Sequence, residues 1–228
     1  MNPLFNLVGT NSLDGDHAML QRWYADHVHL LFHFGGLLEA QLMQRADLQP
    51  GQKEASAATH YLCLYRFASA GAFAAFEVSP ERANAPKLGR PEWMAGGIQI
   101  ALRQQYEPVS HRSQGWSGTV AHMDVQAFHL PVQPHSDAMH EAERWLQGCI
   151  HEVMEEPGAL YLHLLRRHGS NGDHTEYLAV RGSTAESGTA GQPLDLPLAG
   201  QSDRFGPAPV AAASLWSTGY RPVATWSR

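Results

Sequence analysis

The stretch from Trp23 to Arg45, WYADHVHLLFHFGGLLEAQLMQR, determines how the rest of the chain can be organised. Apolar and aromatic side chains recur every third or fourth residue before the glycines, which predicts one face of an amphipathic helix over about residues 15–34. These side chains are Leu20, Trp23, Tyr24, His27, Leu30, Leu31 and Phe34. Gly35–Gly36 is expected to supply the left-handed residue that ends the helix, and a strand over residues 38–47 follows.

The same pattern returns 122 residues later without a gap. Seven of the 24 residues in the window 22–45 are identical to their counterparts, well above what composition gives by chance. The counterparts that match are Arg144, Trp145, His151, Gly158, Leu160, Leu164 and Arg167. We therefore predict a tandem duplication, with a first repeat over residues 1–113 and a second, degenerate repeat over residues 118–228.

Taken in order, the first repeat reads as β-α-β-β-α-β, the order of ferredoxin-like domains. Strands are predicted over residues 4–10, 38–47, 60–68 and 98–106, with a second helix that begins after Ser69. The strand HYLCLYRFA is apolar on both faces, which indicates that both of its faces are covered. The predicted fold class is α+β, with two antiparallel sheets packed face to face as an α+β barrel and the helices outside.

The second repeat is predicted to lack its second helix. Residues 182–209 are rich in Gly, Ser, Ala and Pro and show no helical period. We interpret them as a mobile surface loop without a packing face, and an ordered lid is the alternative.

Composition excludes several classes of function. The formal net charge is −6 and there is no block of Lys or Arg, which argues against a nucleic acid or an anionic membrane as partner. No apolar run approaches the length of a membrane span, and the N-terminus lacks the basic region of a signal peptide. A cytoplasmic protein is therefore expected. Cys63 and Cys149 each lie in an apolar run, so we expect two buried free thiols.

The segment Trp23-Tyr24-Ala25-Asp26-His27, followed by an apolar turn and Gly-Gly, resembles the W-Y-x-x-H…P-G segment of EthD-like proteins. These belong to the dimeric α+β-barrel superfamily. The strand YLCLYRFAS and the aromatic-rich helix after it are similar to the third strand and second helix of that family. The resemblance covers about residues 3–112 and implies that two ferredoxin-like units build the barrel, here within one chain.

The resemblance places His27 at the position of the helix histidine of the family. Two departures stand out: Gly35 occupies a position where proline is usual, and Cys149 replaces His27 in the second repeat. At most one repeat therefore keeps the histidine.

From the residues alone, His27 is predicted to face the sheet beside Trp23 and Leu31. Burial would hold its imidazole neutral, so that it could act as an acid or base or hydrogen-bond a ligand. Tyr61 and Tyr65 of the following strand are expected to help line the same pocket. The alternative is a core histidine whose nitrogens are satisfied by the protein.

Other histidines are candidates for ligand sites. His29 and His33 have the i, i+4 spacing of a metal site but lie on the outward face, and no third ligand accompanies them. A basic cluster formed by His163, Arg166, Arg167 and His168 could meet an anion, although a solvated strand end is favoured. No metal and no cofactor are expected.

Two function classes remain. The first is a metal-free enzyme or binding protein for a small apolar or aromatic molecule, in which His27 is the acid/base or hydrogen-bonding group. The second is a non-catalytic ligand-binding or structural barrel. A weaker third reading comes from fused α+β barrels that bind haem, and would need His140 or His151 as ligand. A homo-oligomer is compatible with each of them.

Overall fold

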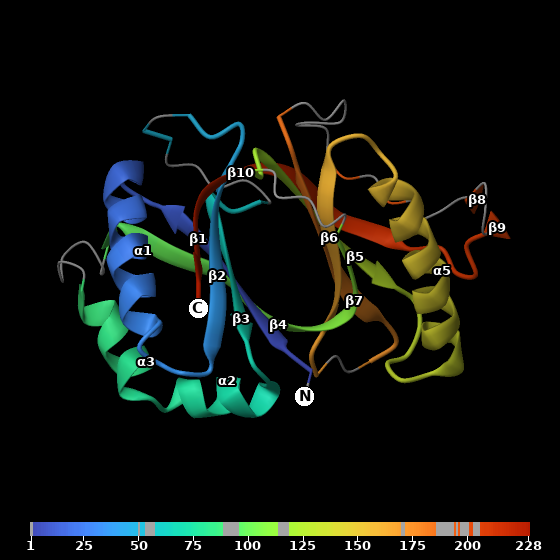
Figure 1. Ribbon diagram of the computed structural model, residues 1–228, viewed down its shortest axis with the longest axis horizontal. Helices are drawn as coiled ribbons and strands as arrows, with labels where there is room; N and C mark the ends of the chain where they lie inside the picture. The colour runs from blue at the N-terminus through green and yellow to red at the C-terminus, as the bar shows by residue number, and fades with distance from the viewer. Residues whose placement is uncertain are drawn as a thin grey trace. The chain divides into compact units, whose positions relative to one another are not determined.

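Figure 1 shows the computed structural model of the chain, with the residues that it does not describe drawn in grey. The described residues are 2–49, 51–52, 58–88, 96–113, 119–169, 172–185, 194, 196, 201–202 and 206–228. They divide into two compact units. Unit 1 comprises Met1–Gln105 and Pro222–Arg228, and unit 2 comprises Tyr106–Arg221.

Unit 1 has the predicted order of elements, with three additions. Its elements are β1 (Leu4–Ser12), α1 (His17–Leu31), β2 (Leu37–Arg45), β3 (Tyr61–Phe67), α2 (Ala70–Glu77), α3 (Pro80–Asn84), the 3-10 helix η1 (Ala85–Leu88), the first part of β4 (Ile98–Ser113) and the end of β10 (Ala213–Ser227). β3 pairs antiparallel with both β1 and β2. The strand order within the unit is β4-β1-β3-β2-β10. The sequence did not predict α3 and η1, because proline and glycine obscure any period after residue 80.

Helix α1 forms where the apolar spacing predicts it. The side chain of Asp16 caps its first turn by accepting a hydrogen bond from the backbone N–H of Met19 at 2.9 Å. The buried side chains of the helix are Leu20, Trp23, Tyr24, Val28 and Leu31. They pack on the sheet together with Tyr65 and Phe67 of β3, so the helix–sheet contact forms the core of unit 1.

The expected role of Gly35–Gly36 is wrong. Helix α1 ends at Leu31 with Phe32 in a right-handed conformation, and neither glycine has a positive φ. Gly36 is instead required for space, because an added Cβ would lie 2.6 Å from Cε1 of Phe34 and 3.0 Å from Cβ of Ala72.

Unit 2 repeats this arrangement with one long helix. Its elements are the second part of β4, β5 (His122–Leu130), α5 (Asp137–Met154), β6 (Ala159–Arg167), β7 (Thr175–Ser183), the short pair β8 (Gln201–Ser202) and β9 (Gly206–Pro207), and the first part of β10. β7 pairs antiparallel with both β5 and β6. The strand order within the unit is β10-β5-β7-β6-β4.

The two units agree in strand register as well as in element order. β2 and β6 have the same bounds displaced by 122 residues. The pairing of β2 with β3 shifts between Leu37 and Glu39, and the pairing of β6 with β7 shifts at the equivalent place, between Ala159 and Tyr161. An irregularity at the same position of both strand pairs supports the duplication, which stays a prediction.

The long segment after β7 departs in part from expectation. Much of the predicted loop, residues 186–193, 195, 197–200 and 203–205, lies outside the described residues, and so does the question of a lid. Leu194 and Leu196, however, are buried in the core of unit 2, and the backbone N–H of Leu196 donates to Oε1 of Gln126 at 3.2 Å. The expectation of a segment without a packing face is therefore wrong at these two residues. The described part of residues 184–212 contains no helix.

The predicted fold class, α+β with antiparallel sheets, is confirmed. Cys63 and Cys149, predicted to be buried free thiols, are both buried, and neither forms a disulfide. Among the described residues, no helix is both long and apolar enough to cross a membrane.

Candidate functional site

Unit 1 contains a cavity of about 160 Å³ between α1 and its sheet. Helix α1 contributes Trp23, Tyr24, His27 and Leu31 to the lining. Residues 23, 27 and 31 are spaced by four, so they stand one turn above another along the face that packs on the sheet. The regular spacing of this helix thus places one titratable ring among aromatic and aliphatic side chains.

His27 is held neutral by its surroundings. Burial lowers the pKa of its imidazole to about 4, a hydrogen bond with the backbone of Ala85 opposes this, and the nearby charge of Arg82 lowers the pKa further. The ring lies 4.3 Å from the ring of Trp23, centroid to centroid, at an interplanar angle of 32°. The imidazole is therefore uncharged at neutral pH and packed against an indole.

The hydrogen bonds of His27 define its tautomer. Nδ1 is buried and has no hydrogen-bond partner in the protein, so we assign the hydrogen bond with the Ala85 backbone to Nε2. A ring nitrogen that bonds a backbone carbonyl carries the proton, which leaves the lone pair on Nδ1. A neutral imidazole with an unused lone pair can accept a proton or a hydrogen bond.

Two phenols of the lining are also uncharged. The hydroxyl of Tyr24 hydrogen-bonds Oγ1 of Thr10 at 3.0 Å, and burial raises its pKa. Tyr65 donates to the thiol of Cys63, and burial raises the pKa values of both groups, that of Cys63 to about 12. Like His27, these groups add polarity to the cavity without adding charge.

Two charged residues that the sequence analysis did not single out also line the cavity. Arg82 of α3 and Arg103 of β4 both line the cavity. Both pair with one carboxylate, that of Glu77: Nη2 of Arg103 lies 2.5 Å from Oε1, and Nε of Arg82 lies 3.7 Å from it. Asn6 of β1 also lines the cavity, and its Oδ1 is buried without a hydrogen-bond partner. Strand alternation could have indicated Arg103, but no local signal marks Arg82 or Asn6.

The structure brings four of the five predicted site residues together. Trp23, His27, Leu31 and Tyr65 line the cavity, whereas Tyr61 is not among the lining residues. The Tyr61 hydroxyl instead accepts a hydrogen bond from Nε2 of Gln21 at 3.1 Å. Of the two tyrosines expected from β3, Tyr65 lines this cavity and Tyr61 lies outside its lining.

The corresponding positions of unit 2 carry a different chemistry. Cys149, the counterpart of His27, is fully buried on α5, and burial raises the pKa of its thiol to about 11. Trp145, the counterpart of Trp23, is half-buried against the core of unit 2. A protonated thiol in this position offers little acid or base chemistry near neutral pH.

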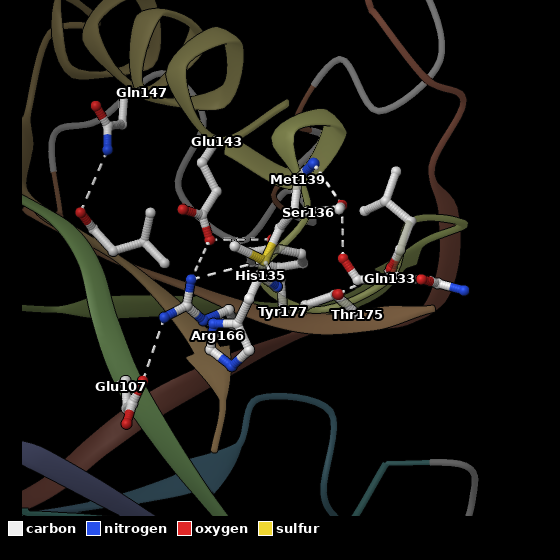
Figure 2. Close-up of polar contacts among 12 residues, drawn as sticks. Glu107, Gln133, His135, Ser136, Met139, Glu143, Gln147, Arg166, Thr175 and Tyr177 are labelled. Atoms are coloured by element: carbon white, nitrogen blue, oxygen red, sulfur yellow. Dashed lines mark hydrogen bonds and ion pairs between the residues drawn. The ribbon is translucent and has the colours of Figure 1, made fainter. Parts of the chain in front are cut away.

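The predicted basic cluster near the end of β6 is neutralised by carboxylates. Figure 2 shows the guanidinium of Arg166 between Glu143 of α5 and Glu107 of β4, at 3.0 and 3.2 Å. The hydroxyl of Tyr177 also donates to Glu143 at 3.1 Å.

The neighbouring basic groups are paired as well. Arg167 pairs with Glu176, and His168 pairs with Glu107. The cluster is thus an internal network of satisfied charges rather than a site for an anion.

The remaining histidines do not converge on a metal. His29 and His33 are exposed, with ring centroids 5.7 Å apart. Nδ1 of His163 lies 3.1 Å from Nδ1 of His111 on the adjacent strand. Within the part of the chain that the structure describes, no three His, Cys, Asp or Glu side chains gather closely enough to hold a metal ion.

His140 and His151, which a haem would need, are both exposed on α5. Nε2 of His151 lies 3.7 Å from a carboxylate oxygen of Glu155 on the same helix. Neither histidine faces the core of unit 2, so neither of these two residues of α5 is placed to bind a haem iron.

No family model and no curated protein matches the sequence. Solved structures do match, and the chain is similar over its full length to a proposed monooxygenase of Fusobacterium nucleatum subsp. nucleatum, with 9% identity, 95% of that chain covered and a TM-score of 0.58. An anthrone oxidase-like protein matches with 12% identity, 100% and 94% of the two chains covered and a TM-score of 0.57. The encapsulated DyP-type peroxidase of Mycobacterium smegmatis matches with 10% identity, 98% and 93% covered and a TM-score of 0.54.

At these identities the similarity shows the fold alone. The chain has the ferredoxin-like α+β barrel fold.

Proposed function

We propose that this protein binds a small apolar or aromatic molecule in the cavity of unit 1, with His27 as its hydrogen-bonding or acid/base group. The observation that carries the proposal is a neutral imidazole with an unpartnered Nδ1, packed on Trp23 in the lining of an apolar cavity. Pockets of this composition, with few polar groups among aromatic walls, are the usual form of small-molecule sites.

The size of the cavity suggests the size of the ligand. An apolar cavity of about 150 Å³ holds benzene, and the cavity here has about 160 Å³. The proposed ligand therefore places one aromatic ring beside Trp23, with a polar substituent within reach of His27. A phenolic hydroxyl could donate to Nδ1, and in an enzyme the same nitrogen would accept the proton.

The resemblance of the Trp23–His27 segment to EthD-like proteins agrees with this proposal. A proposed monooxygenase and an anthrone oxidase-like protein are among the structures with this fold, so small-molecule chemistry is compatible with it. A cytoplasmic location and a homo-oligomer remain predictions of the sequence, as does the assignment to the EthD-like group.

Phenol titrated into the protein and followed by calorimetry tests the proposal. His27→Gln keeps much of the bulk of the side chain, so we expect a folded protein whose phenol affinity falls about ten-fold. Val8→Phe should abolish binding by filling the space, because Val8 lines the cavity. Cys149→Ser, at the equivalent position of unit 2, is the matched control and should bind phenol as the unaltered protein does.

The pH dependence separates the role of His27 from simple packing. The affinity for phenol should be constant from pH 8 to 6 and fall as the pH approaches about 4, where Nδ1 becomes protonated. His27→Gln should remove this dependence. Strong destabilisation by His27→Gln, with phenol affinity unchanged in the remaining folded protein, would show that His27 is a core packing residue without a role in binding.

A further inference from the structure

The polar groups of the cavity are not evenly distributed. Most of the lining is aliphatic or aromatic, whereas both charged members, Arg82 and Arg103, are guanidinium groups about one third exposed. They come from α3 and β4, two elements that are separated from each other in the sequence and are both far from His27 along the chain. The cavity therefore combines apolar walls with two cationic groups.

Among the residues that the structure describes, the two arginines pair with one carboxylate, that of Glu77. Glu77 accepts from Nη2 of Arg103 at hydrogen-bond distance, but Nε of Arg82 lies 3.7 Å from the same oxygen, beyond that distance. Two positive charges thus face one negative charge. A planar anion could pair with a guanidinium in two-point fashion, which the single Glu77 oxygen does not provide.

The positive charges of the two arginines affect titratable groups of the cavity lining. Arg82 lowers the pKa of His27, and Arg103 acts to lower that of Tyr65, although burial dominates both groups.

We infer that the ligand of this cavity is a one-ring aromatic acid, whose carboxylate binds Arg103 and Arg82 while its ring occupies the apolar space beside Trp23. Glu77 is the counter-ion of the empty site, and the ligand carboxylate competes with it. The inference rests on the proposed function, because it assigns a charge to the molecule proposed there.

Benzoate and benzamide form a matched pair of probes, since they have similar shape and differ in charge at pH 7. We expect calorimetry to show benzoate binding about ten-fold more tightly than benzamide. Arg103→Gln should abolish the preference and leave benzamide binding unchanged. Glu77→Gln should increase the affinity for benzoate several-fold, because it removes the competing carboxylate.

Arg66→Gln is the control variant. Arg66 is an arginine of unit 1 that pairs with Glu39 at 2.9 Å and is exposed to a similar degree, but it does not line the cavity. Its substitution should leave the preference for benzoate intact.

The possible outcomes separate the two proposals. If phenol and benzamide bind but benzoate shows no preference, or if Arg103→Gln retains one, the assignment of an acid is wrong and the cavity site stands. If none of the three probes binds, the proposed function fails and the assignment of an acid fails with it.

Discussion

Equivalent positions of the two units hold the same hydrogen-bonded cluster in two electrostatic forms. In unit 1, the amide of Gln21 on α1 donates to the hydroxyl of Tyr61 at 3.1 Å and lies 3.4 Å from the amide oxygen of Gln44 on β2. Gln21 and Gln44 each have their counterpart 122 residues later, and there the chain has Glu143 and Arg166. The neutral pair of unit 1 is thus an ion pair in unit 2.

The strand register shows that these positions of the two units are equivalent in the structure as well as in the sequence. Gln44 is opposite Tyr61 in the β2–β3 pairing, and Arg166 is opposite Tyr177 in the β6–β7 pairing. The hydroxyl of Tyr177 donates to Glu143, as the Tyr61 hydroxyl contacts Gln21.

The comparison shows which polar groups are structural and which are available to a ligand. In unit 2 the carboxylate of Glu143 binds the guanidinium of Arg166 and the phenol of Tyr177, as Figure 2 shows. In unit 1 the cavity lining retains Nδ1 of His27 and Oδ1 of Asn6 without partners in the protein. Satisfied groups specify a fold, whereas unsatisfied groups next to a cavity are free to recognise a ligand.

The largest expected difference concerns the two clusters. Glu143→Ala removes one member of a largely buried ion pair and leaves Arg166 and Tyr177 without it, so the free energy of unfolding should fall by about 3 kcal/mol. Gln21→Ala removes only neutral hydrogen bonds and should cost about 1 kcal/mol. Urea denaturation of both variants measures the two values. Equal losses of unfolding free energy would show that the charges of the unit 2 cluster add nothing to its contribution to stability.

Acid pH should reveal the histidine that only unit 1 keeps. His27 has a pKa of about 4 in the folded protein and about 6.5 when unfolded, so the unfolded chain binds more protons between these values. The contribution is fully present above pH 6.5 and is lost as the pH falls toward 4, by about 2 kcal/mol after allowance for partial exposure.

Because carboxylates titrate in the same range, the measurement is the difference between the unaltered protein and His27→Gln. The stability of His27→Gln should decline less from pH 6.5 to 4. His140→Gln, at an exposed position of α5, is the control and should follow the unaltered protein. Parallel curves for all three proteins would contradict a His27 that is held neutral in the folded protein.

The glycine shared by both units should be sensitive to substitution for two different reasons. Gly36→Ala brings a methyl group too close to Phe34 and should cost about 1–2 kcal/mol. Gly158, its counterpart, has a φ of 84°, so Gly158→Ala should cost about 1 kcal/mol through backbone strain. Gly35→Ala meets no atom within 4 Å and should be nearly neutral. Thermal unfolding of the three variants ranks them, and a costly Gly35→Ala would contradict this explanation.

The smallest difference between the units is expected for the two thiols. Both are buried, and burial raises their pKa values to about 12 for Cys63 and about 11 for Cys149. A thiol reagent at pH 8 should label each at least about 100-fold more slowly in the native state than in urea. Single-cysteine variants distinguish the two sites. Rapid native labelling of Cys149 would indicate an open pocket in unit 2 and make that unit the better candidate.

Much of the fold could be predicted because its signals are local. The spacing of Leu20, Trp23 and Leu31 predicts a helix face, and the 24-residue match predicts the second helix and strand from the first. The repeat also pointed to the position that distinguishes the units, since His27 and Cys149 occupy it.

The rest of the site depends on contacts between distant segments. Glu77, Arg82 and Arg103 meet only because α2, α3 and β4 fold together, and no periodicity encodes that meeting. Tyr61 lies outside the cavity lining for a related reason. It shares a face of β3 with Tyr65, but the two residues are four positions apart. At the rise of a β-strand, four positions span about 13 Å, whereas neighbours on the same face, two positions apart, are separated by about 7 Å. A shared face therefore does not imply a shared cavity.

The central claim is that the ligand site lies in unit 1 and not at the equivalent place in unit 2. Trp23 and Trp145 occupy equivalent positions of α1 and α5, so their indole N–H resonances report on the two places directly. Phenol titrated into ¹⁵N-labelled protein should shift the resonance of Trp23 and leave that of Trp145 unchanged, with Trp23→Phe and Trp145→Phe assigning the two signals. A shift of the Trp145 resonance with Trp23 unaffected would contradict the account.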